Sequence, residues 1–213
     1  MSMLLIFDLD GTLIDSRQDL CTAINLMRNH YGLPPLSLDT VSGYVGDGIR
    51  KLVVRSFQGF ETDIDEAVRL DFDFYTQHLY DTTIPYPGVI EGLSALDKAG
   101  HTLALISNKP LAACTELLRH FRISDLFASV LGGDSCAHRK PSPEPIFMTL
   151  RATGVDARDA WMIGDNHTDI EAARRAGITS AFVQYGIGRA ASESPAKTFD
   201  TFDELTRYFL YGH

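Results

Sequence analysis

Short runs of hydrophobic residues recur along the chain, and the first of them, residues 3–7, stops abruptly at Asp8. A run of this length without polar alternation is typical of a strand that is buried on both faces, as in a parallel sheet. Similar runs follow later, separated by stretches long enough for helices, at residues 102–106, 128–131, 160–163 and 180–183. This alternation predicts a Rossmann-like parallel sheet with right-handed crossovers and helices on both faces.

The stretch between the first two runs has a different pattern. Asp15 or Ser16 can cap a first helix there. Apolar residues at helical spacing are found again at residues 49–57 and 64–79, with no convincing strand between them. The apolar positions recur at helical spacing, beginning with Leu20, Ala23, Ile24, Met27 and Tyr31. This pattern predicts an all-helical segment.

The domain boundaries follow from this change of pattern. Two prolines at positions 85 and 87 mark a linker, after which the strand and helix alternation begins. We therefore expect an α/β fold in which residues 1–15 and 85–213 form the sheet domain, while residues 16–84 form an inserted helical cap domain. Within the sheet domain, residues 186–196 are expected to be a loop and residues 202–210 a closing helix.

Composition and charge narrow the class of protein. The chain has 213 residues, of which 45% are hydrophobic and 22% charged, so it can bury a sizeable core. The formal charge of −9 argues against a nucleic-acid partner, which needs a basic surface. Three widely spaced cysteines indicate buried thiols in a reducing compartment. Since no signal peptide and no run of about 18 apolar residues is found, we expect a cytoplasmic protein without a membrane partner.

Polar residues that can carry out chemistry follow the hydrophobic runs or lie between them. The carboxyl ends of parallel strands meet at one edge of a sheet, and open α/β sheets bind their ligands there. Residues far apart in the sequence are therefore expected to converge. The candidates are Asp8, Asp10, Ser107, Asn108, Lys140, Asp165 and Asp169.

Taken in order, these candidates form a recognisable series of motifs. Asp8 begins a DxDGT sequence, Ser107 and Lys140 follow, and Asp165 and Asp169 are the acids of a GDxxxD sequence. The series resembles the haloacid dehalogenase superfamily of phosphatases over nearly the whole chain. A carboxylate can attack phosphorus, and Asp8 directly follows the strand, so it is the expected nucleophile of an aspartyl-phosphate intermediate. The resemblance implies that Asp10 protonates the leaving oxygen and then activates water.

The resemblance also implies a Mg²⁺ cofactor. A cation is needed because carboxylates would otherwise repel a phosphate dianion, and Mg²⁺ prefers oxygen ligands. By resemblance, its ligands are Asp8, the backbone carbonyl of Asp10, and Asp165. Thr12 and Asp169 are expected to support these ligands from behind, with Asp169 orienting Lys140 or a metal-bound water.

The remaining candidates are expected to bind the phosphoryl group. Lys140 would supply charge to its oxygens and orient Asp8, while Ser107 and the backbone N–H of Asn108 would donate hydrogen bonds. Taken singly, Ser107 is more simply a strand-end turn, Lys140 a solvated lysine and Asp169 a helix-terminal acid. Their joint occurrence with the acidic motifs favours the functional interpretation.

The helical insertion bears on the substrate. Its segments 15–20 and 45–53 are similar to those of phosphoglycolate phosphatases, where a cap closes over the site and excludes water. Arg50 and Lys51 could then meet the carboxylate of a two-carbon phosphate, although solvated charges on a helix are the more common fate of such residues. His167 could approach the substrate or face water.

Several functions stay open at this point. The expected partner is a small anionic phosphate ester, with 2-phosphoglycolate ahead of pyrophosphate, a nucleoside monophosphate and a sugar phosphate. A sugar-phosphate mutase would use the same fold, although Thr12 replaces the apolar residue usual there. A phospho-receiver signalling domain also gathers Asp, Ser or Thr and Lys around Mg²⁺, but its order of elements differs. The protein could be a monomer or a homodimer.

Overall fold

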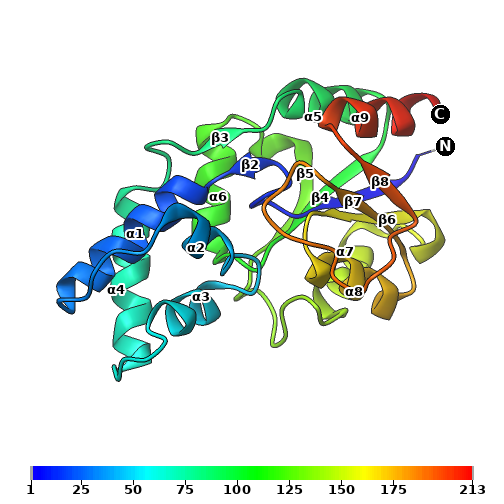
Figure 1. Cartoon of the computed structure of the whole chain (residues 1–213). Coiled ribbons are helices and arrows are strands. Elements are labelled where there is room, and N and C mark those ends of the chain that lie inside the picture. Colours follow the sequence, from blue (N-terminus) through cyan, green and yellow to red (C-terminus); the bar gives the residue numbers. More distant parts are fainter. Residues whose placement is uncertain (1, 213) are drawn as a thin grey trace.

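A six-stranded parallel sheet forms the centre of the larger domain in the computed structural model, which describes residues 2–212 (Figure 1). The strand order is β5-β4-β1-β6-β7-β8, so the first strand lies inside the sheet between β4 and β6. The strands are β1 Leu4–Phe7, β4 Thr102–Ile106, β5 Phe127–Leu131, β6 Ala160–Gly164, β7 Thr179–Val183 and β8 Lys197–Phe199. The sheet and its doubly covered arrangement were predicted from the hydrophobic runs, and this fold class is confirmed.

Helices cover both faces of the sheet (Figure 1). Because side chains alternate along a strand, Leu5 and Phe7 face one layer of helices while Leu4 and Ile6 face the other. The first layer consists of α5 Val89–Lys98, α6 Leu111–His120 and α9 Phe202–Tyr211. The second consists of α7 Glu144–Thr153 and α8 His167–Ala176, and the short 3-10 turns η1 Ser124–Leu126 and η2 Ala157–Asp159 precede β5 and β6.

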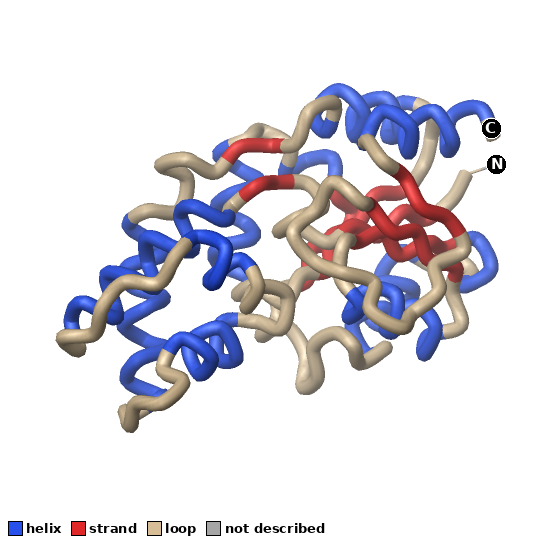
Figure 2. The backbone as a smooth tube through the Cα atoms, viewed as in Figure 1, coloured by secondary structure: helices blue, strands red, loops and turns tan. Residues whose placement is uncertain are grey.

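The segment after β1 forms a separate helical domain beside the sheet (Figure 2). Its long helix α1 packs against α4, and α3 packs on α4 as well. The helices are α1 Arg17–His30, α2 Leu38–Ser42, α3 Ile49–Ser56 and α4 Ile64–Gln77. A helical cap was predicted here, and the helical region is present.

Two short connections join the domains, and their structure was not predicted. β2 Ile14–Asp15 pairs antiparallel with β3 Ile84–Pro85, which brings the two chain crossings side by side. Next to this ribbon the buried carboxylate of Asp19 accepts hydrogen bonds from the backbone and hydroxyl groups of Thr82 and Thr83. Burial alone would raise the pKa of Asp19, but these donors outweigh it and the pKa lies below its usual value.

Other differences from the sequence prediction are small elements. β8 pairs parallel with β7 at the sheet edge and is only three residues long, while α2 is a five-residue helix. Both are too short to show a hydrophobic period. Within residues 2–212, no helix combines the length and the apolar character that crossing a membrane requires.

Candidate active site

A pocket lies between the carboxyl edge of the sheet and the helical domain. The sheet domain contributes the loop after β1 and the loop after β4, as the topology predicts for a parallel sheet. Its lining residues from this side are Asp8, Asp10, Ser107, Asn108, Lys109 and Pro110. The helical domain covers the opposite side with Leu20, Val45, Gly46, Gly48, Ile49, Leu52, Asp71, Phe72 and Tyr75.

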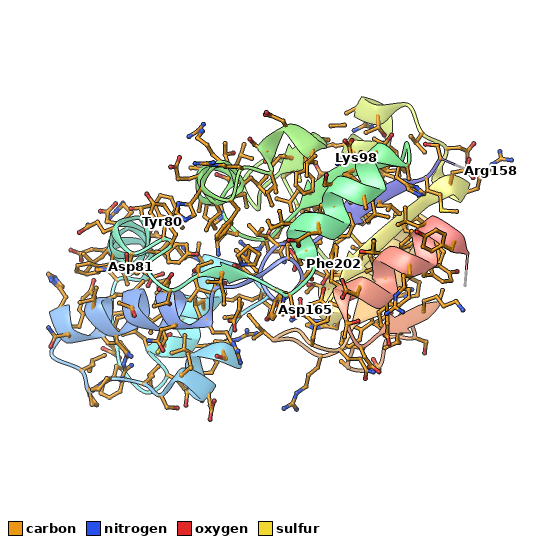
Figure 3. The ribbon with its side chains drawn as sticks, turned by 90° about the horizontal axis from the view of Figure 1, so that it is seen from above. Tyr80, Asp81, Lys98, Arg158, Asp165 and Phe202 are labelled. Atoms are coloured by element: carbon orange, nitrogen blue, oxygen red, sulfur yellow. The ribbon has the colours of Figure 1, made fainter. Side chains whose placement is uncertain are left out.

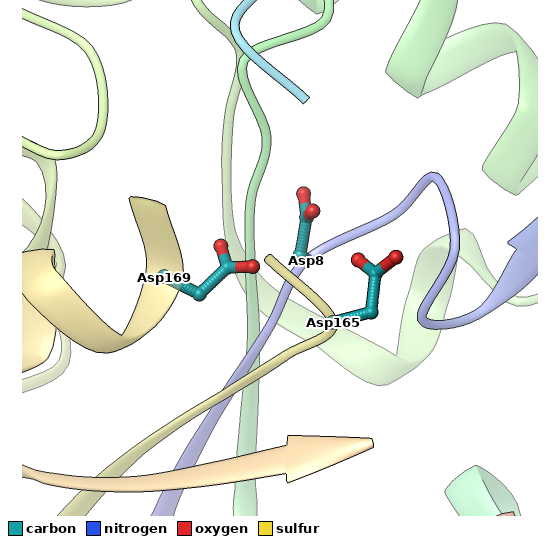
Figure 4. A group of neighbouring side chains, drawn as sticks. All are labelled: Asp8, Asp165 and Asp169. Carbon is teal, nitrogen blue, oxygen red and sulfur yellow. The ribbon is translucent and has the colours of Figure 1, made fainter. Parts of the chain in front are cut away.

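Three buried carboxylates converge beside this pocket (Figure 4). Asp8, Asp165 and Asp169 each have one oxygen within 4.8 Å of the others, and all three are at most 6% exposed. In Figure 3 Asp165 lies between the helical domain, marked by Tyr80 and Asp81, and the sheet domain. The convergence of residues so far apart in the sequence follows from the adjacency of β1 and β6.

The electrostatics of this cluster fit a bound cation. Burial, with the charges of Asp8 and Asp169, raises the pKa of Asp165 to about 8. Burial also raises the pKa of Asp8 to about 6, although Lys140 lowers it and Asp169 raises it. Among the described residues no hydrogen-bond donor satisfies Asp8 Oδ1, which pairs with Lys140 Nζ at 2.9 Å without hydrogen-bond alignment. An all-oxygen cluster that repels itself can hold a hard metal ion.

Glycines allow Asp165 to be held tightly. Gly11 has φ +84°, and a Cβ atom there would come within 2.1 Å of Asp165 Oδ2. That oxygen accepts the backbone N–H groups of Ile187 and Gly188 at 2.8 and 2.7 Å. The hydroxyl of Thr12 donates to the other oxygen at 3.3 Å, so Thr12 lies behind Asp165 as a supporting residue.

Lys140 forms ion pairs with two of the carboxylates, those of Asp8 and Asp169. Its Nζ lies 2.9 Å from Asp8, donates to Asp169 Oδ1 at 2.6 Å and donates to the backbone carbonyl of Ile106 at 2.6 Å. The second oxygen of Asp169 accepts the N–H of Asn166 at 3.0 Å in the capping box that starts α8. Asp169 is therefore both a helix-terminal acid and a partner of Lys140, which fixes where the ammonium group points.

Ser107 and Asn108 lie in the turn after β4, at the pocket wall. The side-chain amide of Asn108 donates to the carbonyl of Lys140 at 3.0 Å and to the carbonyl of Gly46 in the helical domain at 2.9 Å. Ser107 Oγ accepts the N–H of Lys109 at 3.3 Å. Asn108 thus ties the sheet edge to the loop that covers it.

Asp10 is not part of the carboxylate cluster, and its side chain has other partners. Both of its oxygens accept from Nζ of Lys109, at 2.6 and 2.7 Å, and one also accepts from the hydroxyl of Ser16 at 2.5 Å. Ser16 makes no side-chain cap of α1, and Asp15 instead pairs with Arg17 at 2.6 Å while also accepting its backbone N–H. Ser16 therefore occupies the N-cap position of α1, as predicted, but its hydroxyl donates to Asp10 and makes no cap hydrogen bond.

Lys109 is a site residue that the sequence interpretation missed. Its side chain is 4% exposed, and its Nζ lies 4.6 Å from the centroid of the Tyr75 ring, beneath the helical domain. The only sequence signal is its place directly after Asn108 at a strand end, and a lone lysine is ordinarily solvated.

Arg50 and Lys51 are not brought to the pocket. Ile49 and Leu52 of α3 line it, so the two charged residues between them face the other way. Arg50 pairs with Asp65 and Lys51 with Asp47, and the two side chains are 54% and 56% exposed. The backbone N–H of His167 donates to Arg189, and His167 is not among the residues that line the pocket.

The fold and the site together define an α/β enzyme with a carboxylate cluster at the sheet edge and a helical cap over it. The chain belongs to the haloacid dehalogenase-like hydrolases, whose family model matches residues 5–183. The family resemblance that the motifs predicted is thereby confirmed, and with it the class of hydrolase.

Similar proteins match over almost the whole chain. A phosphoglycolate phosphatase of Psychrobacter arcticus is 38% identical, over 99% of this chain and 96% of the relative. A phosphoglycolate phosphatase of Chromobacterium violaceum is 37% identical, over 93% of this chain and 92% of the relative. The crystal structure of a predicted phosphoglycolate phosphatase from Haemophilus somnus superposes with a TM-score of 0.92 at 31% identity, covering 97% of both chains.

Proposed function

We propose that this protein hydrolyses 2-phosphoglycolate to glycolate and inorganic phosphate, using Mg²⁺ and an aspartyl-phosphate intermediate on Asp8. The observation that carries the proposal is the buried pair of Asp8 and Lys140 at the base of a covered pocket. The substrate is inferred from relatives bearing that name that align with nearly all of the chain.

In the first step an oxygen of Asp8 attacks phosphorus, and the bond from phosphorus to the glycolate oxygen breaks. Asp10, as the general acid, gives a proton to the departing oxygen so that glycolate leaves as an alcohol. In the second step Asp10 takes a proton from water, which attacks phosphorus and breaks its bond to Asp8. Inorganic phosphate leaves, and both carboxyl groups return to their starting states.

The surrounding residues hold these groups in place. Lys140 keeps Asp8 aimed along the edge of the sheet and offers charge to the phosphoryl oxygens. Lys109 and Ser16 hold the side chain of Asp10 at the pocket, where a leaving oxygen can be reached. Ser107 and Asn108 border the same space and can donate to the phosphoryl group.

Asp8, Asp165 and the backbone carbonyl of Asp10 are the proposed ligands of Mg²⁺. Asp169 is less suited to that role, because one of its oxygens accepts from Lys140 and the other from the N–H of Asn166. When bound, Mg²⁺ would neutralise the charge that builds up between the carboxylates and the phosphoryl oxygens.

The dimensions of the pocket favour a small leaving group. Its cavity measures about 50 Å³, and the helical domain walls it with apolar side chains. A small leaving group such as glycolate suits these dimensions. A receiver domain is not supported, because the chain belongs to a hydrolase family and a helical domain interrupts it after β1.

The test is phosphate release from a panel of 2-phosphoglycolate, ethyl phosphate, pyrophosphate, AMP and glucose 1-phosphate, with Mg²⁺ and with EDTA. We expect 2-phosphoglycolate to give the highest kcat/KM, and Asp8→Asn or Asp10→Asn to lower kcat by roughly a thousandfold or more. Asp97→Asn, an exposed acid at the far side of the sheet domain, is the control that keeps full activity. Full activity in Asp8→Asn would exclude the covalent route, and a clear preference for another ester would exclude the substrate.

A further inference from the structure

One turn of α4 places two polar side chains on the cap side of the pocket. Asp71 and Tyr75 are four residues apart, so they lie on the same face of the helix. Both line the pocket, and they are only 2% and 3% exposed. Neither residue was singled out from the sequence for chemistry, since Tyr75 fits the apolar face of the helix and Asp71 fits no motif.

These two side chains lack the partners that buried polar groups normally have. Among residues 2–212, Asp71 Oδ1 and the hydroxyl of Tyr75 accept or donate no hydrogen bond, although each atom is shielded from solvent. Nζ of Lys109 lies 4.6 Å from the centroid of the Tyr75 ring and donates hydrogen bonds to both oxygens of Asp10, and an ammonium group cannot accept a hydrogen bond from the Tyr75 hydroxyl. A buried polar atom without a partner costs free energy, and in a binding pocket the missing partner is the natural role of a ligand.

The neighbours of Asp71 decide which form its carboxyl group takes. The helices packed against α4 present Leu20 from α1 and Ile49 and Leu52 from α3 to the pocket, all apolar. The other charged residues that line the pocket, among residues 2–212, come from the sheet domain and are Asp8, Asp10 and Lys109, of which Lys109 acts on Asp71.

Burial raises the pKa of Asp71 to about 7, and the opposing field of Lys109 does not reverse this. Burial also raises the pKa of Tyr75, whose hydroxyl therefore keeps its proton. Below about pH 7 this side of the pocket thus offers two O–H donors, and the residues that line it from the helical domain include no lysine or arginine.

We propose that Asp71 and Tyr75 form the subsite for the leaving-group end of the substrate, where their O–H groups donate hydrogen bonds to an acceptor oxygen. This inference rests on the proposed function and deepens it, because in 2-phosphoglycolate the acceptor is the carboxylate, one carbon from the ester oxygen. Arg50 and Lys51, the residues first expected to bind it, are paired on the outer surface.

The subsite has a specific chemical signature. A protonated Asp71 attracts a carboxylate, whereas an ionised Asp71 repels it, so binding of carboxylate esters should weaken as pH rises through about 7. Ethyl phosphate has no acceptor at that end, so its binding should not weaken in this way as pH rises. Ionisations of the phosphate group and of the catalytic acids affect both esters alike and cancel in the ratio of their KM values.

The experiment measures KM for 2-phosphoglycolate, ethyl phosphate and phosphoethanolamine on both sides of pH 7. The inhibition constant of 2-phosphoglycolate against ethyl phosphate hydrolysis is measured in parallel. In the wild type the preference for 2-phosphoglycolate should fall by about tenfold for each pH unit above the pKa of Asp71. Asp71→Asn keeps an N–H donor but cannot ionise, so it should remove this pH dependence and keep the preference. Asp73 is an exposed acid on the same helix, and Asp73→Asn should change neither the preference for 2-phosphoglycolate nor its pH dependence.

A second variant keeps the proposal testable if Asp71→Asn does not fold. Tyr75→Phe should raise KM for 2-phosphoglycolate by roughly tenfold and leave ethyl phosphate within about twofold. A preference that is independent of pH in the wild type, a pH dependence that persists in Asp71→Asn, or a preference that Tyr75→Phe leaves unchanged would overturn the subsite. A preference for phosphoethanolamine that Asp71→Asn abolishes would show an ionised Asp71, and would also overturn it.

Failure of the proposed function looks different. If the wild type hydrolyses ethyl phosphate but not 2-phosphoglycolate, the substrate assignment fails. The inhibition constant then still reports on the subsite. Tight, pH-dependent inhibition that Asp71→Asn makes independent of pH would support the subsite, and weak inhibition that neither variant alters would refute it.

Discussion

Replacing Asp165 with asparagine should stabilise the metal-free protein, even though it removes a residue of the proposed metal site. Burial, together with Asp8 and Asp169, raises the pKa of Asp165 to about 8 from the 3.8 of an unperturbed group. The folded state therefore holds this proton more tightly than the unfolded state. Stability is lost progressively as pH rises from about 4 to about 8, and the full penalty applies above that window.

The size of the penalty follows from the shift. At pH 7 the group lies about three pH units above its unfolded value, and each unit corresponds to about 1.4 kcal/mol, which gives about 4 kcal/mol. This is an upper figure, because the neighbouring carboxylates titrate together and share the penalty. The asparagine side chain of the Asp165→Asn variant would keep an oxygen for the N–H groups of Ile187 and Gly188 while removing the charge. We expect a rise in Tm on the order of 10 °C or somewhat less.

The assay is thermal unfolding in EDTA and in excess Mg²⁺, at pH 7 and at pH 5. In EDTA at pH 7 the Asp165→Asn variant should unfold at a higher temperature than the wild type, and the difference should shrink at pH 5. Mg²⁺ should raise the Tm of the wild type, since it binds only the folded state, and should leave the variant unchanged. Asp97→Asn should follow the wild type throughout. A variant less stable than the wild type in EDTA, or equal Mg²⁺ shifts in both, would refute this reasoning.

Two further predictions concern a buried lysine at the pocket and two exposed cations of the helical domain. Lys109→Met should lower kcat by roughly a hundredfold, because Asp10 loses the partner that both of its oxygens contact, while Lys98→Met on the exposed face of α5 should keep wild-type phosphate release. An unchanged kcat in Lys109→Met would contradict the positioning of Asp10 by this lysine. Arg50→Ala and Lys51→Ala should each leave KM for 2-phosphoglycolate within about twofold, because exposed ion pairs contribute little. A tenfold increase in either variant would show that the helical domain rearranges to bring that residue to the substrate.

The sheet and the residues at its edge could be predicted because their signals are local. A strand buried on both faces must be hydrophobic throughout, and its polar successor marks the edge of the sheet. Asp8 and Asp165 follow such strands, so their meeting required only the rule that parallel strands end at one side. The support of Asp165 by Thr12 came from the motif, and the structure adds the glycine at position 11 that makes the close approach possible.

The residues that were missed depend on contacts across the chain. Lys109 is buried only because Asp10 and the ring of Tyr75 close over it, and neither neighbour is near it in sequence. Ser16 looked like a helix cap because a serine before a helix commonly is one, but a nearby carboxylate competes for its hydroxyl. Arg50 was expected at the substrate because its segment is similar to those of phosphoglycolate phosphatases. In α3, however, Ile49 faces the pocket, so the next residue, Arg50, faces solvent.

Polar contacts between the two domains hold the loop that covers the pocket. The carbonyl of Gly46 accepts from Asn108, and a Cβ at Gly46 would come within 2.4 Å of the Asn166 side chain, so the covering loop rests directly on the sheet edge. In this arrangement Asp71 and Tyr75 line the pocket together with Asp8 and Asp10. A movement of the covering loop away from the sheet edge would break the hydrogen bond from Asn108. Because a single neutral hydrogen bond contributes only about 1 kcal/mol, it can favour the closed form without trapping it.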